Sequence, residues 1–270
     1  MKRLIYINSN HDNCQYINEA VISAQSFRKF VRDCEIVLYT NQKDFQHEVF
    51  DHVFVVDFVI PPLLADKCHL NGQMVVKHMA MIESPAEYNL VLGSDTFALS
   101  DKINDAFDLL EKFDFALALA HAPGRVTGGN FDLPFAWPEF NCDVIFYRKN
   151  DITQNLLKEW QQMYISNQID HPHDQGSFRY LTYHRDVKVA TLPFEYNNRA
   201  GLYGSQGAQN ERKNNKTIIL QNRELVTEIL SGKASVEEII ERAVQSNKVN
   251  SPCIESIRSF IKRVIAKLIR

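Results

Sequence analysis

Short apolar runs alternate with helically spaced segments in the first hundred residues, and this alternation limits the folds the chain can adopt. The runs predict strands at 4–7, 35–40, 53–58 and 89–92. Between the first two, apolar residues from Ile17 to Val31 recur at the spacing of one helix face. Strands separated by helices of this length form a parallel sheet with crossover connections. We therefore expect an α/β fold.

The later elements are predicted from the same two patterns. Strands are predicted at 114–120 and 144–147, and helices at 74–82, 100–110 and 152–164. Ser100 is expected to cap its helix. Two stretches, 121–140 and 197–216, are rich in turn-forming residues, and we interpret them as long surface loops. After residue 220 the chain is predicted to be helical to its end.

The composition is that of a folded domain and disfavours several classes. The 270 residues, 45% of them hydrophobic, suffice for one large α/β domain or two small ones. A formal net charge of -3 does not indicate nucleic-acid binding. The five cysteines are widely spaced without a Cys-x-x-Cys pair, which argues against disulfides and zinc and favours a reducing cytosol. No apolar run approaches a membrane span or the core of a signal peptide, so we expect a cytoplasmic protein.

A lone carboxylate, Asp95, follows the apolar run at 89–92. In open parallel sheets, ligands bind beyond the carboxyl ends of the strands. Gly93 and Ser94 let a ligand come close, and a carboxylate at this place suits Mg²⁺ or Mn²⁺ bound to a diphosphate. Ser-Asp-Thr is also good turn chemistry, so a purely structural role for Asp95 stays open on spacing alone.

The order of elements resembles that of the GT-A glycosyltransferases, which use nucleotide-diphospho-sugar donors. Six segments carry the resemblance in the family's order: 5–10, 93–96, 113–116, 140–145, 173–175 and 192–197. The resemblance implies a mixed, mainly parallel, Rossmann-like sheet flanked by helices. It also implies transfer of a sugar from a UDP- or GDP-type donor to a hydroxyl of a saccharide or lipid-linked acceptor, assisted by Mn²⁺ or Mg²⁺.

The chain departs from the family in its implied metal motif. Gly93 replaces the first Asp of the family's Asp-x-Asp, and Asp143 stands where the family has a glycine. No histidine follows His184 to complete the metal shell, although Gln221 falls roughly where one would be expected. The resemblance thus implies one carboxylate ligand, Asp95, with diphosphate oxygens and water as the others.

Besides Asp95, the resemblance implies four donor-side residues. Tyr6 and Asn8, at the end of the first strand, would meet the base and ribose, Tyr6 by stacking or by a backbone contact. Lys77 would neutralise a phosphate as a point charge, and Ser94 lies next to the metal ligand. A core role for Tyr6 and a solvated position for Lys77 are the structural alternatives.

Asp174 is the catalytic candidate. Glycosyl transfer needs a base for the acceptor proton or a group that stabilises the oxocarbenium charge, and a carboxylate serves either purpose. Within HPHDQGSFRYL, Asp174 is expected at a helix N-terminus, pointing back at the strand ends. Gln175 follows it as in the family. A simple N-cap is the structural alternative.

We assign to the acceptor side Asn141, the loop that precedes it, and Gln175. Trp137 and Phe131 can stack on a sugar face, with local packing as the alternative. His171 and His173 form a His-x-His pair. No nearby cysteine or third histidine supports zinc, so we interpret both as pocket-lining or surface residues.

The chain lacks residues that several other enzyme classes require. A haloacid-type phosphatase needs a nucleophilic Asp after the first strand, where this chain has Asn-Ser-Asn. A Rossmann dehydrogenase needs Gly-x-Gly-x-x-Gly at that position, and a nucleotidyltransferase normally has a loop rich in glycine and basic residues there. The alternative that remains is a non-catalytic nucleotide-sugar-binding domain.

The C-terminal segment 254–270 is amphipathic and basic. Its apolar residues recur at spacings of three and four, and no acidic residue follows Glu255. Such a helix is typical of peripheral contact with a membrane surface, where a lipid-linked acceptor would lie. Packing on the rest of the chain or on a second subunit is the alternative. We divide the chain into a catalytic domain, 1–222, and a helical C-terminal extension, 223–270.

Overall fold

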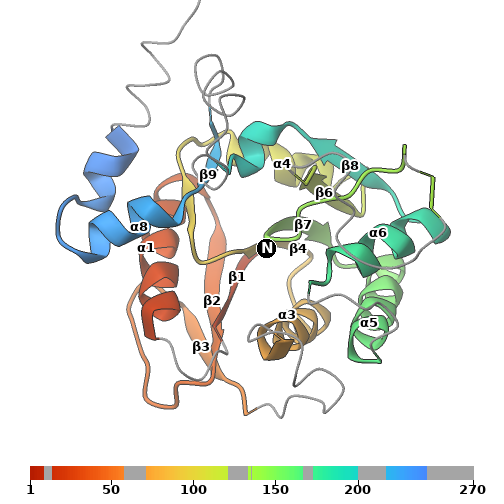
Figure 1. Ribbon diagram of the computed structural model, residues 1–270, viewed down its shortest axis with the longest axis horizontal. Coiled ribbons are helices and arrows are strands. Elements are labelled where there is room, and N and C mark those ends of the chain that lie inside the picture. The colour runs from red at the N-terminus through yellow and green to blue at the C-terminus, as the bar shows by residue number, and fades with distance from the viewer. Residues whose placement is uncertain are drawn as a thin grey trace, which may run out of the picture.

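A computed structural model describes residues 1–8, 14–57, 71–120, 133–134, 136–166, 173–199 and 217–241. Within these residues, seven strands form one mixed sheet in the order β3-β2-β1-β4-β7-β6-β8 (Figure 1). The strands are β1 (Lys2–Asn8), β2 (Cys34–Thr40), β3 (His52–Val55), β4 (Tyr88–Leu92), β6 (Phe115–Ala118), β7 (Val144–Arg148) and β8 (Val189–Leu192). Strand β1 pairs in parallel with β2 and β4, whereas β7 runs antiparallel to β4 and β6. The expected mixed, mainly parallel sheet is therefore confirmed.

Helices cover both faces of the sheet. They are α1 (Cys14–Phe30), α3 (Asn71–Glu83), α4 (Ile103–Leu109), α5 (Asp151–Ile165) and α6 (Gln175–His184). Alternate residues of β1 serve the two faces: Leu4 and Tyr6 join the core under α1 and α4, and Ile5 and Ile7 join the core under α3, α5 and α6. The near-continuous apolar run of β1 follows from this burial on both sides.

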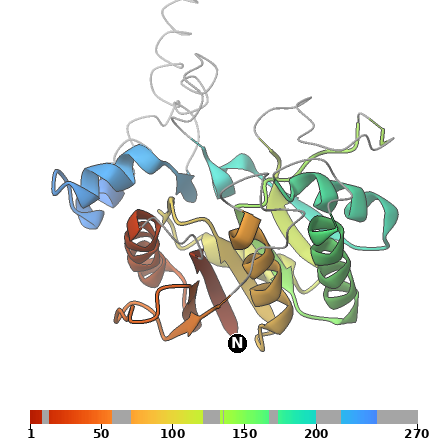
Figure 2. The ribbon, with the colours of Figure 1, turned by 60° about the horizontal axis from the view of Figure 1, so that its bottom comes forward.

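A small second sheet stands at the C-terminal end of β4. It pairs β5 (Thr96–Ala98) antiparallel with β9 (Ile219–Gln221). Helix α8 (Arg223–Leu230) follows β9 at once and lies beside α1 (Figure 2). Its Val226 is buried in a cluster with Phe97 of β5. The division of the chain after residue 222 stays a prediction.

One local prediction was wrong and another extended too far. The strand expected at 53–58 is present as β3, but it ends at Val55. Ser100 does not cap α4, because the N-cap is Lys102, whose side chain makes no capping hydrogen bond. Instead the Ser100 hydroxyl oxygen accepts from the backbone N–H of Lys102 at 3.3 Å, which is a local turn ahead of the helix.

Several predictions fall on residues that the structure does not describe. They are the amphipathic segment 254–270, most of the loop at 121–140 and most of the loop at 197–216. Among the described residues, none of the helices combines the length and the apolar character needed to cross a membrane.

Candidate functional site

Asp95 lies beyond the end of β4, in the turn that leads to β5. Because β7 runs antiparallel to β4, with Leu92 opposite Val144, the residues before β7 lie at this same end of the sheet. The backbone N–H of Gly93 donates to the carbonyl of Asp143 at 2.7 Å. The two turns are therefore fixed against each other, and both present an aspartate.

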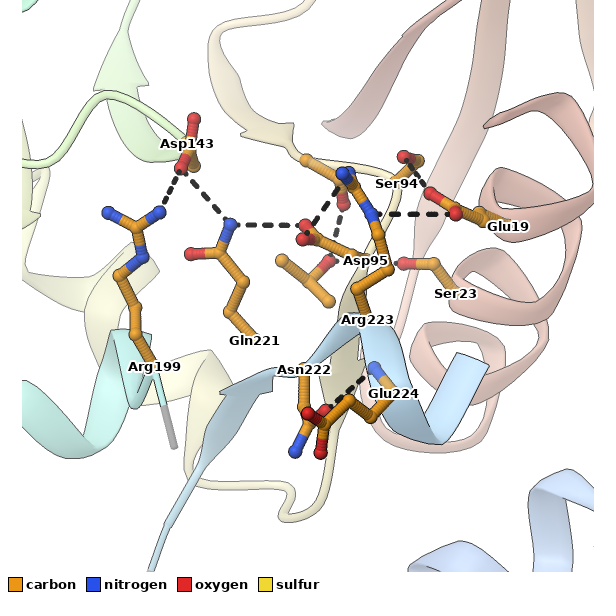
Figure 3. A network of polar contacts seen from close by, with 12 residues as sticks. Glu19, Ser23, Ser94, Asp95, Asp143, Arg199, Gln221, Asn222, Arg223 and Glu224 are labelled. Carbon is orange, nitrogen blue, oxygen red and sulfur yellow. Dashed lines mark hydrogen bonds and ion pairs between the residues drawn. The ribbon is translucent and has the colours of Figure 1, made fainter. Parts of the chain in front are cut away.

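Gln221, the last residue of β9, lies between these aspartates (Figure 3). Its Nε2 donates to Asp95 Oδ1 and to Asp143 Oδ2, each at 3.1 Å. Its Oε1 is buried and has no hydrogen-bond partner among the described residues. Pairing of β5 with β9 sets Thr96 opposite Gln221 and so carries the amide to the end of β4. Gln221, noted in the sequence for its position, does reach Asp95.

Two arginines flank the carboxylates (Figure 3). Arg223 Nη2 lies 3.6 Å from Asp95 Oδ2, and its Nε lies 3.5 Å from Oε1 of the buried Glu19. Arg199 Nη2 lies 3.8 Å from Asp143 Oδ2. These separations exceed hydrogen-bond length, so the arginines balance charge without occupying the carboxylate lone pairs. Planar guanidinium groups at such a place suit a phosphate.

Burial affects the ionisation of Asp95. Burial and then the nearby Asp143 raise its pKa above the ordinary value, and Arg223 and Gln221 lower it only in part. Within the described part of the chain, no three His, Cys, Asp or Glu side chains form a group that would hold a metal. The metal ligand predicted at Asp95 therefore has a second carboxylate, Asp143, and the Gln221 amide as neighbours.

Ser94 and Tyr6 both form hydrogen bonds with side chains of α1. The Ser94 hydroxyl donates to Glu19 Oε2 at 3.0 Å, and donor contact by Ser94 stays a prediction. The Tyr6 ring is 1% exposed, and its hydroxyl is 2.7 Å from Ser23 Oγ. Stacking of Tyr6 on a base was therefore a wrong prediction, because the ring is enclosed in the core. A backbone contact to the nucleotide stays a prediction.

A second polar cluster lies next to the first, between α3 and α6. Asp174, at the N-cap of α6, makes no capping hydrogen bond. Its carboxylate forms an ion pair with Lys77, and Oδ2 is 3.2 Å from Nε2 of His78. Asp174 is 2% exposed and Lys77 is 6% exposed, with the lysine ammonium over the ring of Trp160. Lys77 is therefore not a solvated lysine, and its contact with a phosphate stays a prediction.

The buried cluster holds Asp174 ionised and His78 neutral. Burial would raise the pKa of Asp174, but Lys77 and then His78 outweigh it and hold that pKa well below its usual range. Burial lowers the pKa of His78, and the nearby Asp174 only partly offsets the effect. A carboxylate with so low a pKa is a poor proton acceptor at neutral pH. What Asp174 can contribute to catalysis is a fixed negative charge.

The neutral state of His78 predicts a pH dependence of stability. Because its pKa is lower in the folded chain than in the unfolded chain, only unfolding lets it take up a proton as the pH falls below about 6.5. Its contribution to the free energy of unfolding is therefore present above that pH and is lost below it, by up to about 1.4 kcal/mol per pH unit.

Urea unfolding of His78→Gln between pH 7 and pH 5 tests this effect. The variant should show a shallower decline of stability than the wild type. His184→Gln, at the exposed end of α6, is the matched control and should decline as the wild type does. An unchanged decline in His78→Gln would show that His78 does not cause it.

The segment 139–143 connects the two polar clusters. The backbone N–H of Cys142 donates to Gln175 Oε1 at 3.3 Å, and Gln175 Nε2 donates to Glu139 Oε1 at 2.9 Å. Lys77 Nζ donates to the carbonyl of Cys142 at 3.4 Å. Asp174 and its neighbour Gln175 are therefore linked to the turn that carries Asp143, Gln175 directly and Asp174 through Lys77.

Asn141 and Trp137 lie on the same side as Gln175. Asn141 is fully buried. Its Oδ1 accepts from the backbone N–H of Asp143 at 2.8 Å, and its Nδ2 has no partner within the described ranges. Trp137 is held on α6, where its Nε1 donates to the carbonyl of Arg179 at 3.2 Å and Arg179 donates back to the carbonyl of Trp137. The indole is partly exposed, and its sugar-stacking role stays a prediction.

Some candidates lie outside the described residues. They are Phe131, His171 and the side chain of Asn8. The second histidine of the pair, His173, is exposed, as the surface interpretation expected.

Sequence reasoning missed four residues of the site. Two of them, Glu19 and Arg223, carry no local signal, since a polar residue on a helix is usually solvated. His78 follows Lys77 in a helix and was hidden by an apolar pattern. Arg199 falls at the start of a stretch that was interpreted as a surface loop. A fifth, Asp143, was noticed only as a departure from the family's glycine, and this departure was the available signal.

Comparison of the whole fold with solved structures finds glycosyltransferases. An active-site mutant of LgtC matches with a TM-score of 0.53 and 10% identity, over 86% of this chain and 96% of that chain. Mouse xyloside xylosyltransferase 1 matches with a TM-score of 0.52 and 12% identity, over 83% and 98% of the two chains. The glycosyltransferase GlyE of Streptococcus pneumoniae TIGR4 matches with a TM-score of 0.56 and 14% identity, over 91% and 64%.

These neighbours are GT-A glycosyltransferases, so the GT-A fold predicted from the sequence is confirmed. At 10% to 14% identity the likeness is one of fold. No protein-family model matches the chain, and no curated protein matches it by sequence.

Proposed function

We propose that this chain is a glycosyltransferase that moves a sugar from a nucleotide-diphospho-sugar donor, of UDP or GDP type, to a hydroxyl of a saccharide or lipid-linked acceptor. One observation supports this most: in a GT-A fold, each candidate carboxylate reaches the segment 139–143 through one intervening side chain. Gln221 joins Asp95 to Asp143. Lys77 joins Asp174 to the carbonyl of Cys142. LgtC, a galactosyltransferase of this fold, has been solved in complex with donor and acceptor sugar analogues.

A divalent cation, Mn²⁺ or Mg²⁺, fits the oxygen atoms at the end of β4. Asp95 offers a carboxylate, and Gln221 has a buried amide oxygen that no described residue contacts by a hydrogen bond. Hard cations prefer such ligands. When bound, the ion would neutralise the donor diphosphate and so favour its departure from the sugar. Arg199 and Arg223 each lie near a carboxylate, and they would contact phosphate oxygens once a donor enters.

Asp174 would act through its charge. Lys77 and His78 fix its carboxylate, and its low pKa keeps it ionised throughout the neutral range. A negative charge beside the reacting sugar stabilises an oxocarbenium-like transition state. The alternative role as a base for the acceptor proton is disfavoured, because its proton affinity is too low at neutral pH.

A non-catalytic nucleotide-sugar-binding domain is the second candidate. The specific observation in its favour is that Asp174 is 2% exposed and already has charged and polar partners. A carboxylate engaged in this way also serves to hold α3 and α6 together.

A donor panel separates the two candidates. UDP-sugars and GDP-sugars are tested for a shift in thermal unfolding, with Mn²⁺ and with EDTA. The stabilising donor is then incubated with the protein, and free nucleotide is measured by chromatography. We expect one nucleotide type to raise the melting temperature and to be hydrolysed slowly without acceptor. Stabilisation without hydrolysis or transfer would favour the binding domain, and no stabilisation by any donor would contradict both.

The cellular setting is also a proposal. A cytoplasmic enzyme of polysaccharide biosynthesis is consistent with the cysteine pattern and with the acceptors named above. Peripheral contact with a membrane through the segment 254–270 stays a prediction, because this segment lies outside the described residues.

A further inference from the structure

The turns at Gly93 and Asp143 share one space beside Asp95. A Cβ atom added at Gly93 would lie 3.6 Å from the Cβ of Asp143 and 3.3 Å from Oδ1 of Asp95. Side chains at 93 and 143 would therefore reach into the same volume. The chain has no acid at 93 and an acid at 143, so this volume receives its carboxylate from the turn before β7.

Gln221 points its amide nitrogen, which cannot bind a cation, at both carboxylates. Its amide oxygen, which can bind one, makes no hydrogen bond to either. Its Nε2 lies 3.1 Å from one oxygen of each (Figure 3). Its Oε1 has no partner in the described part of the chain, although Gln221 is only 3% exposed. Buried amide oxygens normally have a hydrogen-bond partner. A half-turn about the last side-chain bond exchanges the two atoms with little change in shape. Without an ion, the nitrogen separates two like charges; with an ion between them, the oxygen would face inward.

The carboxylates remain accessible to an ion. The side chain of Asp143 is 38% exposed and that of Asp95 is 9% exposed, so Asp143 forms the solvent side of the pair. The flanking guanidinium groups stand 3.8 Å and 3.6 Å away, and neither makes a hydrogen bond to the carboxylates. Among the described residues, therefore, no cationic side chain occupies the lone pairs of either carboxylate.

We propose that Asp143 is the second carboxylate ligand of the divalent cation, and that Gln221 turns its amide oxygen inward to become a third ligand. The inference rests on the proposed function and names the protein side of its cation site. Three protein oxygens leave room for phosphate oxygens and water, which suits Mn²⁺ or Mg²⁺. The carboxylate missing at Gly93 is thus supplied by the neighbouring turn.

Binding of Mn²⁺ alone tests the proposal. The full chain is titrated without nucleotide, and free Mn²⁺ is measured by electron paramagnetic resonance. Asp143→Asn keeps the side-chain shape and should weaken Mn²⁺ binding at least about tenfold. Gln221→Leu should also weaken it. Asp186→Asn, an exposed acid beyond the far end of α6, is the matched control and should bind as the wild type does.

Relocating the carboxylate provides a second, independent test. Gly93 does not have a positive φ, so an aspartate there meets no backbone strain. The double variant Gly93→Asp with Asp143→Gly should regain most of the Mn²⁺ affinity that Asp143→Gly loses. Circular dichroism and thermal unfolding establish that each variant is folded.

The results separate this proposal from the proposed function. Wild-type affinity for Mn²⁺ in Asp143→Asn, or no measurable Mn²⁺ binding by the wild type, would overturn the role of Asp143. In either case the donor panel with EDTA still reports whether the chain binds and hydrolyses a nucleotide sugar. If the panel fails while Mn²⁺ binds through Asp143, the proposed function is wrong and the cation site stands.

Discussion

Asp174→Asn is expected to lower the free energy of unfolding by about 3–5 kcal/mol. The substitution removes the charge that Lys77 faces, and it leaves an ammonium group that is 6% exposed without its ion-pair partner. An unpaired buried charge is strongly destabilising, whereas the intact pair is a weak source of stability. Urea unfolding at neutral pH measures the loss.

A double-mutant cycle identifies the cause. Lys77→Met alone should also destabilise, and Lys77→Met combined with Asp174→Asn should recover much of either loss, because no unpaired ion remains. Glu87→Gln breaks the solvent-exposed pair with Arg148 and should cost little, since solvent screens that pair. Additive losses at Lys77 and Asp174 would contradict a coupled pair.

The same substitution should lower turnover by about 10² or more while donor affinity stays near normal. Because the pKa of Asp174 lies well below its usual range, its charge does not change between pH 6 and pH 8. The factor by which Asp174→Asn slows transfer should therefore be constant across that range. A factor that grows with pH would indicate a base that titrates there. Full activity of folded Asp174→Asn would contradict a catalytic role for Asp174.

Asp95→Asn should abolish metal-dependent donor binding and leave the fold as stable as before or more stable. Burial and the nearby Asp143 raise the pKa of Asp95 above its unfolded value. The stability that this group contributes is therefore present below the unfolded pKa and is lost as the pH rises through the folded pKa. At neutral pH, where the carboxyl group is ionised in the unfolded chain, its burial works against folding. Asparagine removes that cost while an oxygen remains for Gln221.

Calorimetry with the donor chosen by the panel checks this prediction. Donor affinity in Mn²⁺ should fall, in Asp95→Asn, to the affinity measured in EDTA, while the melting temperature is unchanged or higher. Ser94→Ala, next in the chain but bonded to Glu19, is the matched control and should keep a response to Mn²⁺. A variant that still binds donor more tightly with Mn²⁺ would show that Asp95 is not the metal ligand.

Much of the fold could be predicted from the sequence because its signals are local. The apolar runs at β1, β2 and β4 and the helical spacing of α1 and α5 depend only on which faces are buried, and the structure has these elements close to the predicted bounds. The place of Asp95 at the end of β4 followed from the same pattern. The short strands β5 and β9 were not predicted, since three residues carry no measurable period.

Tertiary structure alone decided which polar residues meet. Strand β7 inserts antiparallel between β4 and β6, and this places Asp143 against Gly93. Pairing of β5 with β9 brings Gln221 to Asp95 across 126 residues. Lys77 was predicted to contact a phosphate, with a solvated position as the alternative. The fold instead makes it the buried ion-pair partner of Asp174 at the start of α6. The spacing of apolar residues indicates which face of a helix or strand is buried. It does not indicate which other element covers that face, so only the fold could show which residues make up the site.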